Sequence, residues 1–256
     1  KENNSIFSAI LTPQGKYLIE FFVIYHEKGY ILDCCANSKN ELIENLSKYK
    51  LRSKVEIKDL SDEFVIGIIN TERFKELQEE TNSSGNTILY RETTFFSDPR
   101  NKKLGARILS NLEKIYLTVK KLNLKITESN EFYSHAYKLG IPEVGLNNLK
   151  NKLFGLEANF EELQAIDFKK GCFVGQENTA RMKLKNKLRK KLVAIKTEAK
   201  LKIGSELKFK NQTIGKVLID KPFPFALIDL YQSDENFIKK ELSVENQKVT
   251  IINFNG

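Results

Sequence analysis

The sequence predicts an α+β fold that ends in a small β-barrel. Strand-like and helix-like segments alternate between residues 6 and 139, which is typical of a mixed α+β body. Beyond residue 191, five short strand-like segments follow one another with little helix between them, and this pattern favours a small barrel. We therefore expect two domains, residues 1–186 and residues 187–256.

The composition agrees with a packed globular chain. Its 256 residues are 41% hydrophobic and include 17 Phe, which is enough for a sizeable core. The longest apolar runs, such as residues 65–69, are far shorter than the roughly 20 residues that cross a bilayer. The net charge of +9 suggests an anionic partner. Lys1 is not a methionine and no signal-peptide pattern follows it, so one interpretation is that an N-terminal segment is missing.

The cysteine and histidine content indicates a reducing compartment. Three cysteines, two of them adjacent at Cys34 and Cys35, make no disulfide framework. Two histidines far apart give no zinc spacing, so we expect no metal site. A cytoplasmic location fits these counts best.

The chain opens with a predicted hairpin. Residues 6–11 and 17–25 are rich in β-branched and aromatic side chains, and Thr-Pro-Gln-Gly at residues 12–15 supplies the turn between them. Residues 29–34 form a third predicted strand, and the favoured interpretation of Cys34 and Cys35 is that they pack in the core.

A helix is predicted to begin at Ser38. Glu41 lies three residues on, which makes a capping box. Four apolar side chains recur at helical spacing and are expected to face the core: Leu42, Ile43, Leu46 and Tyr49.

The rest of the first domain continues the alternation. The predicted elements are strands at residues 55–60, 64–69 and 87–91 and helices at residues 71–80 and 130–139. Gly140 and Pro142 end the last helix, and His135 within it is expected to be a packing residue. Arg100 and Arg107 fall in a predicted loop, where each could bind a carboxylate or phosphate but where arginines are usually solvated.

A strongly basic segment precedes the barrel. Seven of the eleven residues from Arg181 to Lys191 are Lys or Arg, and their alternation with Leu184 and Leu188 predicts a strand with one basic face. This face is either a solvated linker or a surface for anions, such as the glutamate tail of a folate or an RNA backbone. Aromatic side chains for base stacking are missing from the run, so RNA is the second choice. The predicted barrel strands are residues 192–196, 206–210, 213–219, 225–230 and 248–254, with a hairpin turn at residues 210–212.

The most distinctive local chemistry surrounds Cys172. Lys169 and Lys170 precede it, and nearby cations stabilise a thiolate, the form of cysteine that attacks electrophiles and binds metals. Gly171 and Gly175 bracket the thiol and allow a sharp turn close to a ligand. The alternative is a small buried cysteine, which is a common type of core residue.

Several motifs resemble the YgfZ family of folate-binding proteins, which support iron-sulfur enzymes. Residues 170–181 read Lys-Gly-Cys-Phe-Val-Gly-Gln-Glu-Asn-Thr-Ala-Arg and closely resemble the family signature. Further matches follow the family's order: Asp-Pro-Arg at residues 98–100 with Leu-Gly-x-Arg at 104–107, Gly-Ile-Pro-Glu-Val-Gly at 140–145, and Leu-Glu-Ala-Asn-Phe at 156–160. The resemblance extends from the turn at residues 12–16 to the barrel.

This resemblance implies a fold like that of the glycine cleavage T-protein, a folate-binding α+β domain followed by a β-barrel. It implies a function in folate-dependent assembly or repair of iron-sulfur clusters, including those of enzymes that thiolate tRNA. Cys172 and Lys170 match the family's functional residues, and the remaining signature positions are Gly171, Phe173, Gly175, Gln176, Glu177 and Arg181. The implied cofactor is tetrahydrofolate or a derivative, with a transient cluster contact through Cys172. The implied partners are iron-sulfur client enzymes or assembly proteins and, weakly, tRNA; no membrane is implied.

A folate-dependent aminomethyltransferase such as the T-protein is the enzyme alternative, and an RNA-binding module is the second alternative. The T-protein loop has no cysteine where Cys172 stands, and its pair of acids corresponds to Ile19 and Glu20, so one acid remains. Its pterin-contacting Glu falls at Asn147, which lacks the charge for a bidentate contact. The family's Arg ahead of Gly-Ile-Pro is replaced near Ala136. The family usually has a further N-terminal segment ahead of Ser8, which we expect to be missing from the sequence given. Candidate folate contacts are Glu20, Arg100, Asn147 and Glu157.

Overall fold

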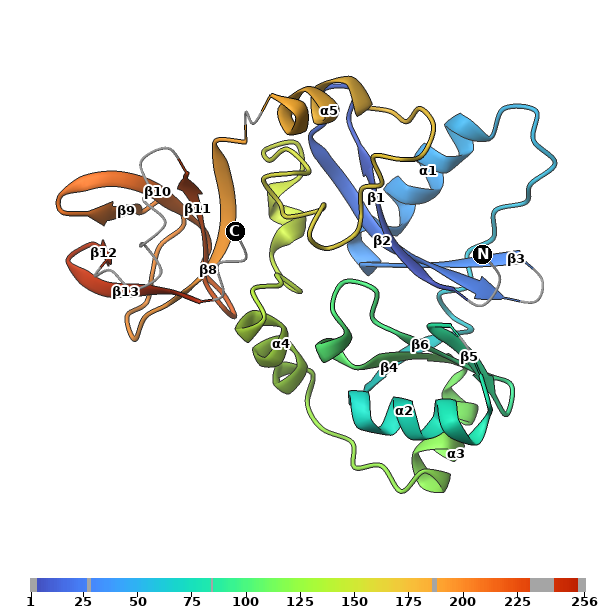
Figure 1. The fold of residues 1–256 in the computed structure, drawn as a ribbon. Coiled ribbons are helices and arrows are strands. Elements are labelled where there is room, and N and C mark those ends of the chain that lie inside the picture. Colours follow the sequence, from blue (N-terminus) through green and yellow to red (C-terminus); the bar gives the residue numbers. More distant parts are fainter. Residues whose placement is uncertain (1–3, 27–28, 84, 186–187, 231–241, 253–256) are drawn as a thin grey trace. The chain divides into compact units, whose positions relative to one another are not determined.

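The computed structural model describes residues 4–26, 29–83, 85–185, 188–230 and 242–252 (Figure 1). Strands and helices mix in the first part of the chain and a closed barrel follows, so the predicted α+β class is confirmed. The chain divides into two compact units. Unit 1 comprises Lys1–Ala9, Ile19–Thr127 and Glu162–Ala165, and unit 2 comprises Ile10–Leu18, Glu128–Glu161 and Ile166–Gly256. The predicted boundary at residues 186 and 187 lies outside the described residues and stays a prediction.

The first sheet has the order β1-β2-β3, with β1 at Ile6–Leu11, β2 at Tyr17–His26 and β3 at Gly29–Cys34. All three strands were predicted. The turn between β1 and β2 is closed by two backbone hydrogen bonds: Thr12 donates its N–H to the Lys16 carbonyl, and Gly15 donates to the Thr12 carbonyl, each at 2.8 Å. This hairpin forms because its alternating apolar side chains can be buried on a sheet face while Pro13 and Gly15 suit the turn.

A short turn of helix, η1 (Ala36–Ser38), leads into helix α1 (Lys39–Lys50). The Ser38 side chain makes no capping hydrogen bond, so the predicted capping box is wrong. Leu42 is buried, but Tyr49 at the end of the predicted apolar stripe is exposed. Cys35 is exposed and Cys34 is half-buried, so core packing is wrong for Cys35.

Residues 55–60 do not form the predicted strand. Apolar and charged side chains alternate there as in a strand, and Val55 is nevertheless 55% exposed. A strand also needs a neighbour that accepts and donates its backbone hydrogen bonds, and no described strand pairs with this segment. Alternation of apolar and charged side chains was therefore not enough to predict a strand here.

The second sheet has four antiparallel strands in the order β4-β7-β6-β5. Their bounds are Val65–Ile69 (β4), Thr87–Tyr90 (β5), Thr93–Ser97 (β6) and Ala106–Ser110 (β7). Helices α2 (Thr71–Glu80) and α3 (Leu112–Lys121) lie on the same side of this sheet (Figure 1) and bury Phe74, Leu77 and Phe95 in a shared core. Their side-chain N-caps are Asn70, which accepts from Arg73 N, and Asn111, which accepts from Lys114 N. Strands β6 and β7 and helix α3 were not predicted, and η2 (Lys102–Leu104) lies between β6 and β7.

Unit 2 contains helices α4 (Ser129–Lys138) and α5 (Gln176–Leu184) and the short helix η3 (Leu146–Leu149). Helix α4 was predicted, but His135 on it is exposed and is not a packing residue. The predicted basic strand is wrong, because residues 181–184 complete helix α5 and β8 begins only at Lys190. Leu184, which was expected to alternate into a strand, is 84% exposed at the end of the helix.

The C-terminal strands form a closed barrel in the order β10-β11-β8-β13-β12-β9. Their bounds are Lys190–Lys196 (β8), Glu206–Phe209 (β9), Gln212–Ile219 (β10), Phe225–Asp229 (β11), Leu242–Val244 (β12) and Gln247–Ile252 (β13). Five of the six were predicted, and β12 was missed. Lys210 and Asn211 join β9 to β10 with φ of 46° and 66°, the left-handed pair that a two-residue hairpin requires.

Among the described residues, none of the helices has the length and apolar character that a membrane crossing needs.

Candidate functional site

Cys172 lies on an exposed loop that leads into helix α5. The alternative of a buried structural cysteine is therefore wrong. The Lys170 ammonium lies 4.9 Å from the centroid of the half-buried Phe173 ring, a cation–π distance. Lys169 N donates to Asp167 Oδ1 at 2.8 Å, which turns the backbone just ahead of the thiol. The sulfur is thus open to a reactant and has two lysines directly before it in the chain.

The end of this loop is held against the turn of the first hairpin. Gly175 has φ of +82°, and a Cβ placed on it would lie 2.5 Å from the Thr12 carbonyl oxygen and 3.0 Å from Gly15 Cα. Asn178 Nδ2 donates to the Gln14 carbonyl at 2.8 Å, and Thr179 Oγ1 donates to the Gly175 carbonyl at 2.8 Å. Only glycine allows the two backbones to approach so closely. Segments separated by about 160 residues are thereby joined beside the thiol.

The two bracketing glycines have different roles. A Cβ on Gly171 would meet nothing within 4 Å, so space around this position does not require glycine. Gly175 is instead buried against the turn. The prediction that both glycines allow a close approach is therefore supported by the geometry at Gly175 alone.

The remaining signature residues shape the start of α5. Gln176 N donates to the Phe173 carbonyl at 3.1 Å, and Phe173 N donates to Gln176 Oε1 at 3.4 Å, so Gln176 closes the turn after the thiol. Arg181 pairs with Glu177 at 2.7 Å one helical turn away, and both side chains are largely in solvent. Such an exposed pair contributes little to stability.

Two of the candidate folate contacts, Asn147 and Glu157, belong to unit 2. The hydroxyl of the fully buried Tyr17 donates to Asn147 Oδ1 at 3.3 Å. The buried Glu157 carboxylate accepts the Phe154 N–H at 3.0 Å, and its backbone carbonyl accepts from Leu192 N at 2.9 Å. Burial raises the pKa of Glu157, although the Phe154 N–H, Lys190 and Lys16 partly oppose that rise.

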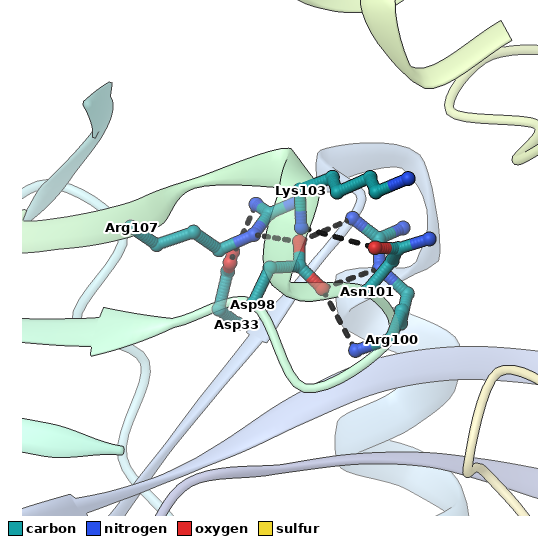
Figure 2. A network of polar contacts seen from close by, with 6 residues as sticks. All are labelled: Asp33, Asp98, Arg100, Asn101, Lys103 and Arg107. Atoms are coloured by element: carbon teal, nitrogen blue, oxygen red, sulfur yellow. Dashed lines mark hydrogen bonds and ion pairs between the residues drawn. The ribbon is translucent and has the colours of Figure 1, made fainter. Parts of the chain in front are cut away.

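The other two candidates, Glu20 and Arg100, belong to unit 1. Arg100 is only 8% exposed and binds Asp98 through two bonds, Nε to Oδ1 at 3.0 Å and Nη2 to Oδ2 at 2.7 Å (Figure 2). Arg107 also reaches Asp98 Oδ2 at 3.4 Å and places Nη1 3.4 Å from Asp33 Oδ2. The expectation of two solvated loop arginines is therefore wrong. Asp98 was noted in the Asp-Pro-Arg motif but was not predicted as the partner of these arginines, although its spacing of two from Arg100 was an available signal.

Aromatic rings complete this charged network. The Arg100 guanidinium lies 4.9 Å from the Phe22 ring centroid and 5.3 Å from that of Phe7, and Arg107 lies 4.2 Å from that of Phe22. Burial alone would raise the pKa of Asp98, but Arg100 and then Arg107 hold it below its ordinary value. The network links β2 and β3 of the first sheet to β7 of the second within unit 1.

The site residues thus fall into two groups. The signature loop, the turn at residues 12–16, Asn147 and Glu157 belong to unit 2, whereas Glu20 and Arg100 belong to unit 1. The turn was predicted as a turn but not as the support of the cysteine loop. Among the described residues, no group of three or more His, Cys, Asp and Glu side chains is arranged to hold a metal ion.

The comparisons with known proteins agree with the expected resemblance. No protein-family model matches the chain. It is 28% identical over 209 residues to the tRNA-modifying protein YgfZ of Buchnera aphidicola, covering 77% of this chain and 64% of that protein. It is 27% identical over 227 residues to the human mitochondrial iron-sulfur cluster assembly factor IBA57, covering 82% and 60%. The corresponding protein of Dictyostelium discoideum is 27% identical over 217 residues, covering 75% and 52%.

The fold is shared with a solved enzyme structure. The aminomethyltransferase T of the glycine cleavage system from Bartonella henselae matches with a TM-score of 0.70 and 13% identity, covering 99% of this chain and 76% of that one. The predicted T-protein-like fold is therefore confirmed. The chain spans about half the length of the first curated relatives it matches. The chain is thus a homologue of the IBA57 and YgfZ proteins, built on the fold of the glycine cleavage T-protein.

Proposed function

We propose that this protein is a folate-dependent accessory factor for the assembly or repair of iron-sulfur clusters, with Cys172 as its working thiol. Its clients would be iron-sulfur enzymes, including those that thiolate tRNA, or the assembly proteins that serve them. The support comes from relatives named as iron-sulfur cluster assembly factors and as a tRNA-modifying protein.

A cytoplasmic location stays a prediction for this chain. The names of the eukaryotic relatives place those proteins in mitochondria.

The observation that carries this proposal is the exposed thiol on a braced loop. A thiolate can ligate iron or accept sulfur, and it needs an accessible and electropositive position to do so. Cys172 is exposed, Lys169 and Lys170 precede it, and the loop is fixed at Gly175 to the hairpin turn. In this proposal Cys172 contacts the cluster or sulfur species, and Lys170 supplies the positive charge next to it.

The proposed cofactor is tetrahydrofolate or a derivative. The amide of Asn147 and the carboxyl of Glu157 have the donors and acceptors that a pterin ring can pair with. Glu20 is a further acidic candidate on β2. Arg100 is engaged with Asp98 and two rings, so it would contact a folate only by giving up part of that network.

Two experiments test the proposal. Tetrahydrofolate is titrated calorimetrically into the full-length protein, with any preceding N-terminal segment restored, and into its Cys172→Ala variant. We expect saturable binding by both proteins, because the thiol and the cofactor have separate roles. Binding by neither protein would refute the folate part of the proposal.

The thiol is tested in cells that depend on this protein. We expect Cys172→Ala to lower the activity of iron-sulfur enzymes while the protein remains folded. Cys35→Ala removes another exposed thiol and serves as the matched control, with no loss expected. Undiminished activity in Cys172→Ala would remove the thiol from the mechanism.

A folate-dependent aminomethyltransferase is the second candidate, favoured by the shared fold. Glu20 and Asn147 stand where that enzyme is expected to carry an Asp and a pterin-binding Glu, and Cys172 has no counterpart in its loop. Aminomethyl transfer to tetrahydrofolate by the purified protein would favour this candidate over the first.

The tRNA contact stays a prediction. Its premise of a basic strand at residues 181–191 is wrong, because α5 occupies the first part of that segment.

A further inference from the structure

Helix α3 presents apolar side chains to solvent as well as to the core. On its inner side, Ile115 packs against the core of the four-stranded sheet, and its Cδ1 lies 3.0 Å from the position that a Cβ on Gly67 of β4 would take. On its outer side, Leu112, Tyr116 and Leu117 are 60%, 59% and 53% exposed. A helix needs only the inner apolar stripe to pack on a sheet. The fold of unit 1 therefore does not explain the outer side chains.

Helix α2, on the same side of the same sheet, has the outer surface of an ordinary solvated helix (Figure 1). Its exposed residues are all charged: Glu72, Lys75, Glu76, Glu79 and Glu80. On α3, by contrast, Leu112 and Tyr116 lie one helical turn apart, which makes them surface neighbours, and Leu117 follows directly. We call these three residues the outer face of α3. A contiguous group of large apolar side chains on one helix indicates a contact surface rather than a solvated one.

Charged side chains accompany this outer face in an order that complements itself. Glu113 lies in the first turn of α3, Lys120 and Lys121 lie in its last turn, and all three are exposed. These signs also suit the helix dipole, which accounts for the charges but not for the apolar residues between them. When two copies of such a helix pack antiparallel, the acidic end of each lies against the basic end of the other.

One two-fold register satisfies the charges and the apolar side chains together. If the axis passes between residues 116 and 117, Tyr116 and Leu117 of both copies meet at the axis. The same register places Glu113 of each copy opposite Lys120 of the other. An acidic partner would be repelled by Glu113 and a basic partner by the two lysines, so the face fits a second copy better than either.

We propose that this protein forms a weak symmetric dimer in which the outer face of α3 packs antiparallel on α3 of a second copy. The apolar contact supplies attraction, and the two pairs of Glu113 with Lys120 set the antiparallel register. A single pair of ten-residue helices buries much less than the roughly 1,600 Å² of a standard interface. The dissociation constant should therefore be on the order of tens of micromolar.

Sedimentation equilibrium of the full-length protein over a range of concentrations measures the dimer. We expect a reversible monomer–dimer equilibrium that weakens about tenfold in Leu117→Gln, because each dimer loses two apolar contacts. Leu89→Gln is the matched control, because Leu89 is 52% exposed on β5 of the same unit, and no change in the dissociation constant is expected. A protein that stays monomeric up to about 1 mM would overturn the proposal and leave the face to a partner of another kind.

A pair of charge reversals tests the register itself. Glu113→Lys alone sets two lysines opposite each other, and Lys120→Glu alone sets two glutamates opposite each other, so each variant should dimerise about tenfold more weakly. An equal mixture of the two variants should recover the wild-type affinity, because both charged contacts of the mixed dimer then join opposite signs. Glu79→Lys makes the same change of net charge as Glu113→Lys but on α2, and should leave the affinity unchanged.

Circular dichroism first establishes that each variant is folded. Failure of the mixture to recover the affinity would overturn the proposal, and so would dimerisation that folded Leu117→Gln and Glu113→Lys retain in full. The thiol and folate experiments are read from enzyme activity and from the heat of binding, so their outcome does not decide this one.

Discussion

Gly15 and Gly175 meet backbone to backbone, with Gly15 Cα 3.0 Å from the position that a Cβ on Gly175 would take. This approach joins the first turn of the chain to the loop that carries Cys172. Since both residues have positive φ, the geometry depends on glycine at each position. The turn is therefore part of the support of the thiol.

We expect Gly175→Ala to destabilise the protein by about 1–3 kcal/mol, since the new methyl group would clash with the Thr12 carbonyl and the backbone would be strained. Urea unfolding measures the change. Gly171→Ala is the matched control within the same motif, because a methyl group there meets nothing within 4 Å. Equal losses of unfolding free energy in the two variants would contradict the close contact between Gly175 and the Thr12 carbonyl.

Asp98→Asn should cost about 3–5 kcal/mol of unfolding free energy, because it leaves buried arginine charges without their shared carboxylate. The same urea series measures it. Glu92→Gln breaks an exposed pair with Lys114 and should leave the urea midpoint nearly unchanged. A loss in Asp98→Asn no larger than that of Glu92→Gln would argue that the buried network is not stabilising.

The pH dependence of stability should carry opposite contributions from two carboxyls. The pKa of Asp98 is held below its ordinary value of 3.8 in the folded state, so its contribution is present above that value and is lost as the pH falls through the folded pKa. Burial raises the pKa of Glu157 above 4.5, so its contribution is present below 4.5 and is lost as the pH rises through the folded pKa.

Glu157→Gln keeps an acceptor for the Phe154 N–H but cannot ionise. We therefore expect it to abolish the part of the stability loss that the wild type shows as the pH rises above about 4.5. Thermal unfolding midpoints measured between pH 4 and pH 8 test this. A wild-type curve and a variant curve that run parallel over this range would contradict the effect of burial on Glu157.

The three thiols should differ in their rate of alkylation by iodoacetamide in the native state. Cys172 and Cys35 are exposed and should react first, while the half-buried Cys34 should react more slowly. Mass spectrometry of peptides sampled over time separates the three. Denaturant should bring the rate of Cys34 close to the others, and protection of Cys172 in the native protein would contradict its exposure.

The sequence predicted elements best where periodicity and turn chemistry agreed. Residues 6–34 form the three expected strands because apolar alternation continues to a turn rich in proline and glycine. Residues 55–60 have similar alternation but no described neighbour strand, so the local pattern failed. Register and pairing depend on distant segments that a local pattern does not contain.

The sequence predicted only those features of the site that depend on residues close together in the chain. The exposed thiol follows from charge and glycine around Cys172, whereas the burial of Arg100 and Arg107 depends on Asp33 and two phenylalanine rings far away in the sequence. Likewise, the basic composition of residues 181–184 concealed a helix, whose residues Arg181 and Lys183 pair with Glu177 and Glu161. Charge counts gave no sign of these pairings.

Closure of the barrel has a consequence for self-association. Each of the six barrel strands that the structure describes is paired on both sides, so these strands present no edge onto which the strand of another molecule could be added. In the open four-stranded sheet, β4 is an edge strand and exposes Ile66 and Ile68. The β1-β2-β3 sheet is open as well. Fibre-like aggregation of this protein by strand addition is therefore expected to begin at an edge of one of the two open sheets rather than in the barrel, and a lysine at position 66 or 68 should suppress the part that begins at β4.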